Sequence, residues 1–324
     1  MEKLNLNSCK VNEKFEGDVG VKVASLQLTK NGDHYISGTM INVRDTWAFK
    51  IWDKGLIKFF RDMIESDVGF KPFVAHVKGR VDEFNGNLSF VVNSVERLYE
   101  DYKEFLPTLD INMLRQEYED FVDDNVATNY VKVINQIFDT DVSLFNGESA
   151  SIGDTIGDLF FYGWAASGNH DAIQGGLCHH TLKMLYIART MINTHPALEA
   201  KKDIIYTGII LHDIGKVQEI VDGNYTKNSF ISHRIMGIEY LAANKSFIVM
   251  QIGIDEYSRL LDILIGHHDQ FEQKPKTIWG YLVHLIDMLD TWATITEQEL
   301  TTDLFAKNAM GERTLKTGDR FFIL

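Results

Sequence analysis

Residues 209–216 read IILHDIGK, an aliphatic run that ends with His212 and Asp213 side by side. The residues just before it, DIIYTG, are also largely apolar, and together they predict a buried helix over 202–214. Burying an ionised carboxylate costs on the order of several kcal/mol unless it is paired or binds a metal. The stretch therefore predicts an α-helical domain with His212 and Asp213 as candidate metal ligands.

Bulk composition indicates a globular protein with a real core, since 45% of the 324 residues are hydrophobic and 24% are charged. The start MEKLNLNSCK lacks the apolar region of a signal peptide, and no apolar run is long enough to span a bilayer. Two distant cysteines, Cys9 and Cys178, suggest no disulfide framework. We therefore expect a cytoplasmic protein without a membrane partner.

The net charge of −14 argues against strong non-specific binding to a polyanion, because such binding depends on clustered lysine and arginine. It does not exclude a nucleic acid held in a local channel. It also fits an enzyme that acts on small molecules, so charge alone selects no function.

The first part of the chain has a β-strand pattern with β-branched and aromatic residues, interrupted by one amphipathic helix. Asn-Gly pairs within 30–33 and 84–87 predict hairpin turns. Three strands, a helix and two more strands form the element order of an OB-fold barrel. The predicted strands are 20–29, 34–43, 46–53, 73–84 and 88–98, and the predicted helix is 55–66.

The rest of the chain has helical periodicity. We predict an OB-fold barrel over 1–99, an acidic helical linker over 100–150 and an all-α domain over 151–324. The helices expected in the last domain are 155–166, 178–193, 202–214, 230–243, 254–267 and 276–295.

Nine of the eleven histidines follow residue 165, and only His34 and His76 fall in the predicted barrel. Several predicted helices each present a histidine or an aspartate where the pattern is otherwise apolar. Imidazole and carboxylate are ligands that suit manganese, iron, zinc or, with more oxygen, magnesium. One such residue would usually be a hydrogen-bonded core residue, but the set predicts a metal site. Its main members are His180, His212, Asp213, His233, His267, His268 and Asp287, with Asp290 as either a supporting or a simply hydrogen-bonded residue.

This ordered set resembles the HD-domain phosphohydrolases, whose pattern is His, His-Asp and a distal Asp on helices. The resemblance implies that His180, His212, Asp213 and Asp287 hold one divalent ion. It further implies a second ion held by His233 and His267 with Asp213 bridging, and His268 as an additional ligand. Two such ions can activate water for in-line phosphoryl transfer. Manganese is the first candidate, with magnesium, iron, cobalt and nickel as others.

Nearly the whole chain is similar to the YhaM-type 3′→5′ exoribonucleases, which join an OB-fold to an HD domain. The resemblance is carried by GDHYISGTMINVRDTWAFKIWD, YKEFLP, GGLCHHTLKM, LHDIGK, GHHD and the tail TLKTGDRFFIL. Cys178, His179 and Asp171 depart from the family pattern, as in a divergent or viral member, but leave the ligand set intact. The resemblance implies metal-dependent 3′→5′ hydrolysis of single-stranded RNA, or of DNA, to nucleoside monophosphates.

Two further residues are candidates for contact with the substrate in that reading. Lys216 would neutralise a phosphate oxygen, or would simply be a favourable cation at a helix C-terminus. His170 would touch the terminal phosphate or have a structural role. Asp213, Lys216 and His170 are thus the predicted catalytic residues.

OB-folds bind single strands by stacking bases on aromatic side chains in a cationic groove. Among the barrel aromatics we expect Tyr35 and Trp47 to be exposed for this purpose. The cations expected to accompany them are Arg44, Lys78 and Arg80.

Two other functions stay open. One is hydrolysis of a small or cyclic nucleotide, with the barrel as a regulatory or assembly module in a homo-oligomer. The other is a nucleic-acid-binding protein whose HD domain no longer catalyses a reaction. A panel of nucleotides and oligomers would distinguish them.

Overall fold

The computed structural model describes residues 4, 6, 9–43, 45–66, 70–84, 87–142, 155–167, 171–266, 274–301, 312–314 and 320–322. Contacts divide the chain into two compact units, and each is described by itself. One unit comprises Met1–Thr108 with Glu299–Leu324, and the other comprises Leu109–Gln298. The domain limits expected from the sequence, at 99 and 150, stay predictions.

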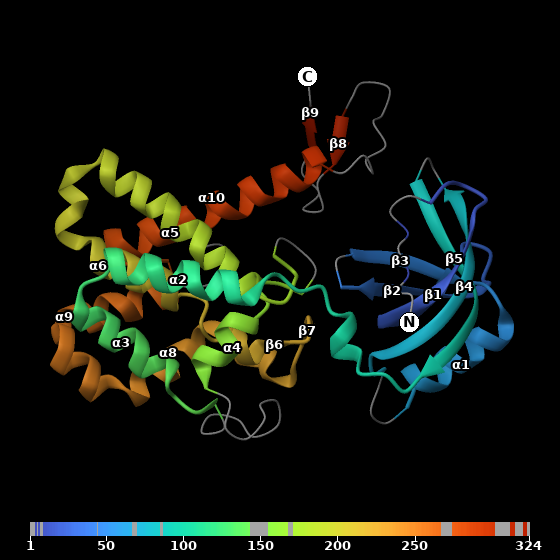
Figure 1. Ribbon diagram of the computed structural model, residues 1–324, viewed down its shortest axis with the longest axis horizontal. Helices are drawn as coiled ribbons and strands as arrows, with labels where there is room; N and C mark the ends of the chain where they lie inside the picture. The colour runs from blue at the N-terminus through green and yellow to red at the C-terminus, as the bar shows by residue number, and fades with distance from the viewer. Residues whose placement is uncertain are drawn as a thin grey trace. The chain divides into compact units, whose positions relative to one another are not determined.

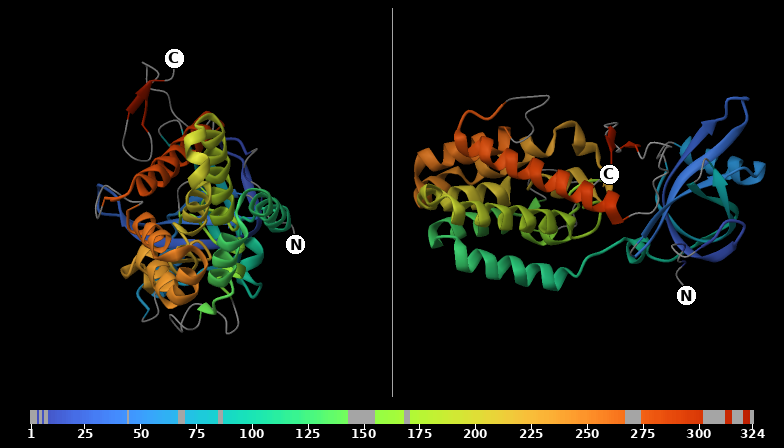
Figure 2. Two further views of the ribbon diagram at one scale, coloured as in Figure 1. Left: turned by 90° about the vertical axis from the view of Figure 1, so that its left-hand side faces the viewer. Right: turned by 90° about the horizontal axis from the view of Figure 1, so that it is seen from above.

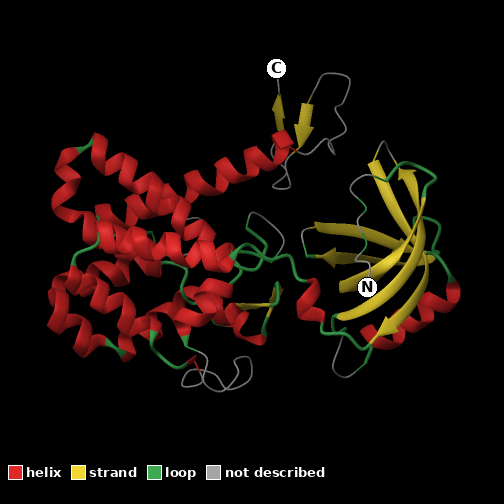
Figure 3. Ribbon diagram, viewed as in Figure 1, coloured by secondary structure: helices red, strands yellow, loops and turns green. Residues whose placement is uncertain are grey.

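The first unit contains a closed five-stranded barrel with strand order β1-β2-β3-β5-β4, in which β1 also pairs with β4 (Figures 1 and 3). All neighbouring strands are antiparallel except β3 and β5, which run parallel. This order, with a helix between the third and fourth strands, confirms the OB-fold prediction. The elements are β1 Lys14–Leu28, β2 His34–Asn42, β3 Asp45–Ile51, α1 Lys54–Ile64, β4 Phe73–Phe84, β5 Asn87–Leu98 and the short helix η1 Tyr102–Phe105.

Helix α1 begins where Asp53 caps its first turn, with Asp53 Oδ1 accepting hydrogen bonds from the backbone N–H groups of Gly55 and Leu56, both 2.9 Å away. The helix places Phe60, which is fully buried, against Phe49 of β3 and Phe73 of β4. Full burial of such a side chain stabilises the fold by about 1.5–3 kcal/mol. The helix therefore completes the barrel core.

Trp47 lies inside the barrel, so the expectation that it is exposed is wrong. It is 7% exposed and belongs to the same core as Phe49 and Ile51, the next two residues on its side of β3. Side chains alternate between the two faces of a strand, so these three share the inner face. Trp52, the first residue after β3, is instead 46% exposed.

The second unit is a helical assembly around one core (Figure 2). The helical spans predicted from the sequence correspond to its helices, although α9 begins earlier than expected and includes a non-helical Gly253 with φ 84°. Its elements are α2 Ile111–Asn125, α3 Thr128–Phe138, α4 Ile156–Tyr162, α5 Gly176–Thr194, η3 Pro196–Lys201, α6 Lys202–Leu211, α7 Lys216–Glu219, β6 Ile220–Val221, β7 Asn224–Tyr225, η4 Lys227–Phe230, α8 His233–Ala243, α9 Lys245–Gly266 and α10 Ile278–Thr301. Strands β8 Glu312–Thr314 and β9 Arg320–Phe322 pair near the C-terminal end of the chain.

Helix α6 is central to this core, since every residue from Ile204 to Leu211 is buried. The segment that follows it is equally enclosed, with His212 1% and Asp213 3% exposed. The buried helix expected from IILHDIGK is therefore present, and it ends with two polar side chains inside the unit. Across the described part of the chain, no helix combines the length and apolar character needed to cross a bilayer.

A polar cluster on β1 and β4 places His76 between two carboxylates. His76 Nδ1 lies 2.7 Å from Asp18 Oδ1, and His76 Nε2 lies 3.1 Å from Glu16 Oε1. The hydrogen bonds to Asp18 and then Glu16 raise the pKa of His76 above its ordinary value of 6.5. A group whose pKa is raised by folding stabilises the fold below its unfolded pKa, and this contribution disappears as pH rises through the folded pKa.

We expect His76→Ala to lower barrel stability more at about pH 6 than at about pH 9, because only protonated His76 pairs with both carboxylates. Pulse-labelling hydrogen exchange of β1 and β4 across a urea series would measure this. His34→Ala, which changes an exposed histidine of the same barrel, is the control. An equal loss at both pH values for His76→Ala would contradict the ion-pair interpretation.

Candidate metal centre

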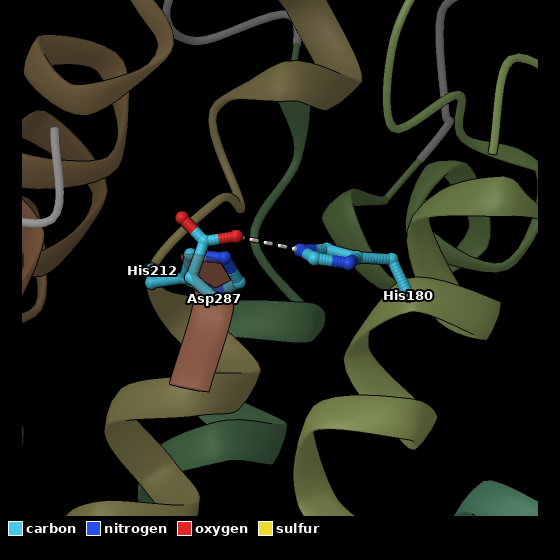
Figure 4. A group of neighbouring side chains, drawn as sticks. All are labelled: His180, His212 and Asp287. Atoms are coloured by element: carbon cyan, nitrogen blue, oxygen red, sulfur yellow. Dashed lines mark ion pairs between the residues drawn. The ribbon is translucent and has the colours of Figure 1, made fainter. Parts of the chain in front are cut away.

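Four elements bring the predicted ligands of the helical unit together. His180 comes from α5, His212 and Asp213 follow α6, His233 begins α8, and Asp287 comes from α10. All five are at most 9% exposed. Figure 4 shows His180, His212 and Asp287 converging, with ligand atoms within 4.8 Å of one another. The tertiary structure therefore assembles residues that are separated by more than a hundred positions in the chain.

Asp213 lies between the histidines. Its Oδ2 is 3.3 Å from His212 Nε2 and 4.0 Å from His180 Nε2, while its Oδ1 is 3.3 Å from His233 Nε2. The same Nε2 atom of His180 also lies 3.3 Å from Asp287 Oδ1. The two oxygens of Asp213 thus face different histidines, which is the arrangement of a carboxylate that can bridge two cations.

The other nitrogen of each of these histidine rings is held by an oxygen. His180 Nδ1 lies 2.7 Å from Asp290 Oδ2, and His233 Nδ1 lies 2.7 Å from Glu219 Oε2. His212 Nδ1 lies 2.6 Å from the backbone oxygen of Ile209. Carboxylate and carbonyl oxygens only accept, so each Nδ1 carries a proton and donates it.

This donor pattern fits a metal site. Metal-binding histidines usually donate one ring N–H to a carboxylate or carbonyl, which fixes the ring and leaves the other nitrogen to bind the ion. Here the nitrogens left are the three Nε2 atoms that face Asp213 and Asp287. Imidazole and carboxylate donors in one buried cluster suit manganese, iron, cobalt, nickel or zinc.

The protonation of His180 depends strongly on its carboxylate neighbours. Burial lowers the pKa of His180, but hydrogen bonds to Asp287 and Asp290 outweigh this and raise the pKa to about 9. Burial also raises the pKa of Asp287, but the hydrogen bond from His180 and its charge hold that pKa well below the usual range. A proton on His180 and a cation therefore compete for the same position, so cation binding releases a proton.

Lys216 reaches the cluster from the first turn of α7. Its Nζ lies 2.6 Å from Asp213 Oδ2, and its side chain is 12% exposed. Burial lowers the pKa of Lys216, but the charge of Asp213 outweighs it and raises the pKa above the ordinary value. Lys216 is therefore a largely buried ammonium group that is paired with the central carboxylate.

A second set of ion pairs holds Asp290, the residue that accepts the hydrogen bond from His180 Nδ1. Lys183 Nζ lies 2.8 Å from Asp171 Oδ2 and 3.2 Å from Asp290 Oδ2, so it joins the two carboxylates. Burial raises the pKa of Asp171, but the hydrogen bond from His179 at 2.7 Å and the charge of Lys183 bring it below the usual range. The residue that orients His180 is thus itself held in place by a cation.

The described part of the chain leaves some predicted residues unplaced. His170, His267, His268 and Arg44 lie outside the described residues, so their roles stay predictions. Of the barrel residues, Tyr35 is partly buried, and Lys78 and Arg80 are exposed. Lys78 Nζ lies 2.6 Å from Glu16 Oε1, and Arg80 Nε lies 3.0 Å from Asp82 Oδ1. Both cations are therefore already paired with acids.

Sequence reasoning missed Glu219, which receives two hydrogen bonds from His233. Besides the Nδ1 contact, the backbone N–H of His233 lies 3.3 Å from Glu219 Oε1. Glu219 is 8% exposed. Glu219 lies in the largely apolar stretch VQEIV, and a carboxylate there indicates a buried polar partner, as it does for Asp213. The sequence did not reveal that this partner is His233, fourteen residues away.

We expect Glu219→Ala to weaken binding of manganese by about 10- to 100-fold, because His233 loses the acceptor that orients its ring. Isothermal titration of the metal-free protein would measure the change. Glu219→Gln should recover much of the affinity, since an amide oxygen still accepts the Nδ1 proton. Glu239→Ala, at an exposed position of α8, is the matched control. Unchanged affinity in Glu219→Ala would remove His233 from the ligand set.

The part of the chain that supplies this cluster matches a known domain. A model of the HD domain matches residues 177–292, a range that contains His180, His212, Asp213, His233 and Asp287. The chain is 25% identical to the 3′-5′ exoribonuclease YhaM of Shouchella clausii, over 97% of this chain and 94% of that protein. It is 26% identical to YhaM of Oceanobacillus iheyensis, over 86% of this chain and 84% of that protein.

A shorter match reaches higher identity. The chain is 30% identical to YhaM of Bacillus subtilis over 42% of its own length and 45% of that protein. Among solved structures, the mitochondrial single-stranded DNA binding protein Rim1 of S. cerevisiae aligns with 28% of this chain and 96% of its own. Its TM-score of 0.24 and identity of 12% are too low to support an argument about this chain.

Proposed function

We propose that this chain, which carries an HD domain and is similar to the YhaM exoribonucleases over most of its length, is a metal-dependent phosphodiesterase that hydrolyses single-stranded RNA from the 3′ end. The products would be nucleoside monophosphates, and single-stranded DNA is the second polymer to test. The observation that carries the proposal is the set of three Nε2 atoms around Asp213 and Asp287, with each Nδ1 already bound.

His180, His212, Asp213 and Asp287 would hold one divalent ion, and His233 together with Asp213 would hold a second. His267 and His268 are proposed to complete the second position. Manganese is the first candidate for both. When bound, such ions supply Lewis acidity, which favours attack by water and stabilises the attacking and leaving oxygens of an in-line displacement.

The side chains of the protein would contribute orientation and charge to this reaction. Asp290 and Glu219 hold the rings of His180 and His233 in the tautomer that exposes Nε2. Lys216, close to Asp213, is proposed to neutralise charge on a phosphate oxygen as the phosphorus–oxygen bond breaks. Water adds to phosphorus, and the 3′-oxygen of the penultimate nucleotide leaves as a hydroxyl group. His170 is proposed to contact the terminal phosphate.

The experiment that tests the activity uses metal-free protein, manganese and a single-stranded RNA labelled at its 5′ end. A manganese-dependent ladder that shortens from the 3′ end, with nucleoside monophosphates as products, is expected. The same strand labelled at its 3′ end should release the label in the first turnover. An intact strand, together with hydrolysis of free or cyclic nucleotides, would replace the proposal with the small-nucleotide activity.

A further inference from the structure

The barrel has a pocket that the sequence prediction did not include. Its volume is about 490 Å³, and it lies between the turn that precedes β2 and the exposed side of α1. Every residue that lines it belongs to the barrel unit. The lining residues that decide its chemistry are Asp33, Trp52, Lys54, Lys58 and Arg61.

The pocket contains a partly exposed aromatic ring, that of Trp52. The Trp52 ring stacks on Tyr35, with ring centroids 4.7 Å apart and an angle of 22° between the planes. Trp52 is nevertheless 46% exposed. Tyr35 covers one face of the indole, so we take the opposite face as the surface that Trp52 offers to a ligand in the pocket. A flat molecule can therefore stack there without a rearrangement of the barrel.

Three cations line the same pocket along one side of α1. Lys54, Lys58 and Arg61 are four and three residues apart, so they lie on one face of the helix, within about 10 Å along its axis. Within the described ranges, none of them forms an ion pair, and Arg61 Nε makes no hydrogen bond. Asp33 is the single carboxylate of the lining.

The local charge contrasts with the rest of the chain. The protein carries a net charge of −14, and the exposed cations predicted to bind nucleic acid, Lys78 and Arg80, are neutralised by Glu16 and Asp82. The pocket at Trp52 instead combines an exposed indole with three cations that form no ion pair with any residue the structure describes. Phosphates and stacked bases are the two features that such a surface recognises.

We propose that this pocket, rather than the Lys78 and Arg80 side of the barrel, binds a single-stranded polynucleotide. A base stacks on Trp52, and neighbouring phosphates contact Lys54, Lys58 and Arg61. The choice of a polynucleotide substrate rests on the proposed function, whereas the location rests on the geometry of the barrel alone.

The test measures binding of labelled single-stranded RNA and DNA to the full-length protein without metal, so that hydrolysis does not interfere. We expect Trp52→Ala to weaken binding by about 10-fold or more, because base stacking on one aromatic ring contributes that much in comparable sites. Lys58→Glu, a surface change, should weaken binding by about 5-fold and reduce its salt dependence. The RNA and DNA strands show whether the pocket prefers one polymer.

Matched controls change the same residue types outside the pocket. Lys14→Glu alters the same charge on β1, and Tyr99→Ala removes an exposed aromatic ring after β5; both should bind like the wild type. Wild-type affinity in both Trp52→Ala and Lys58→Glu would overturn the proposed pocket. The proposal would also be overturned if polyglutamate, which has negative charge but no bases, displaced the labelled strand as well as an unlabelled strand does.

The two proposals fail in different ways. If the wild type binds the strand but manganese produces no hydrolysis, the exonuclease proposal is wrong and the pocket is retained. If the wild type shortens RNA while the pocket variants bind normally, the pocket is wrong and the exonuclease is retained.

Discussion

Replacing Asp213 by asparagine is expected to lower kcat/KM for strand hydrolysis by at least about 1000-fold, or about 4 kcal/mol of transition-state stabilisation. The carboxylate faces His212 with one oxygen and His233 with the other, at 3.3 Å in both cases. An amide has one oxygen and no charge, so it cannot serve both cation positions. It also leaves the largely buried Lys216 without its partner at 2.6 Å.

The measurement pairs initial rates on 5′-labelled RNA with the manganese content of the protein. Both should fall in Asp213→Asn, while circular dichroism stays close to that of the wild type. Asp255→Asn, the same change at an exposed position of α9, is the matched control and should keep full activity. Activity within about 10-fold of the wild type at unchanged metal content would remove Asp213 from the site.

Gly215→Ala is expected to have the second large effect, on the free energy of unfolding as well as on metal binding. A Cβ at Gly215 would lie 1.9 Å from the backbone oxygen of His233 and 2.7 Å from its carbonyl carbon. Gly215 has φ −69°, which any residue adopts, so the effect is steric. Either α8 or the HDIGK segment must move, and such overpacking costs about 3 kcal/mol.

The displaced backbone belongs to His233, so Gly215→Ala should also weaken manganese binding. Urea unfolding and isothermal titration would measure the two effects. Gly237→Ala is the control one turn further along α8, because its Cβ would come no closer than 3.1 Å, to the side-chain end of Leu264, with Ile214 Cγ2 at 3.4 Å and the backbone nitrogen of Gly215 at 3.9 Å. Alanine also favours a helix by up to about 1 kcal/mol, so the control should stay near wild-type stability. A stable Gly215→Ala protein with normal affinity would contradict the close packing.

The fold and most of the candidate site could be predicted from local patterns. Alternating residues and Asn-Gly turns predicted the barrel strands, and helical periodicity predicted the helices of the other unit. His212 and Asp213 were identified because polar groups at the end of an apolar helix require a partner. The barrel residues that would bind nucleic acid were harder to predict, since strand alternation alone does not reveal which face is inside.

Trp47 and Trp52 show that difficulty. Both are aromatic residues of the same segment, but they lie an odd number of positions apart, so they cannot share one face of a regular strand. Trp47 is in the core and Trp52 is on the surface beside α1. The cations of the barrel were equally hard to assign, because the ion pairs of Lys78 and Arg80 depend on where neighbouring side chains lie.

The sequence by itself determined the order of the elements and the residue types available as ligands, because periodicity and the cost of burying charge act locally along the chain. Only the tertiary structure decided that Asp213 lies between three histidines, that Asp290 and Glu219 orient two of the rings, and that Gly215 touches the backbone of His233. Apart from the contact between Asp213 and its neighbour His212, they join residues at least fourteen positions apart in the chain, and their geometry depends on how whole helices pack.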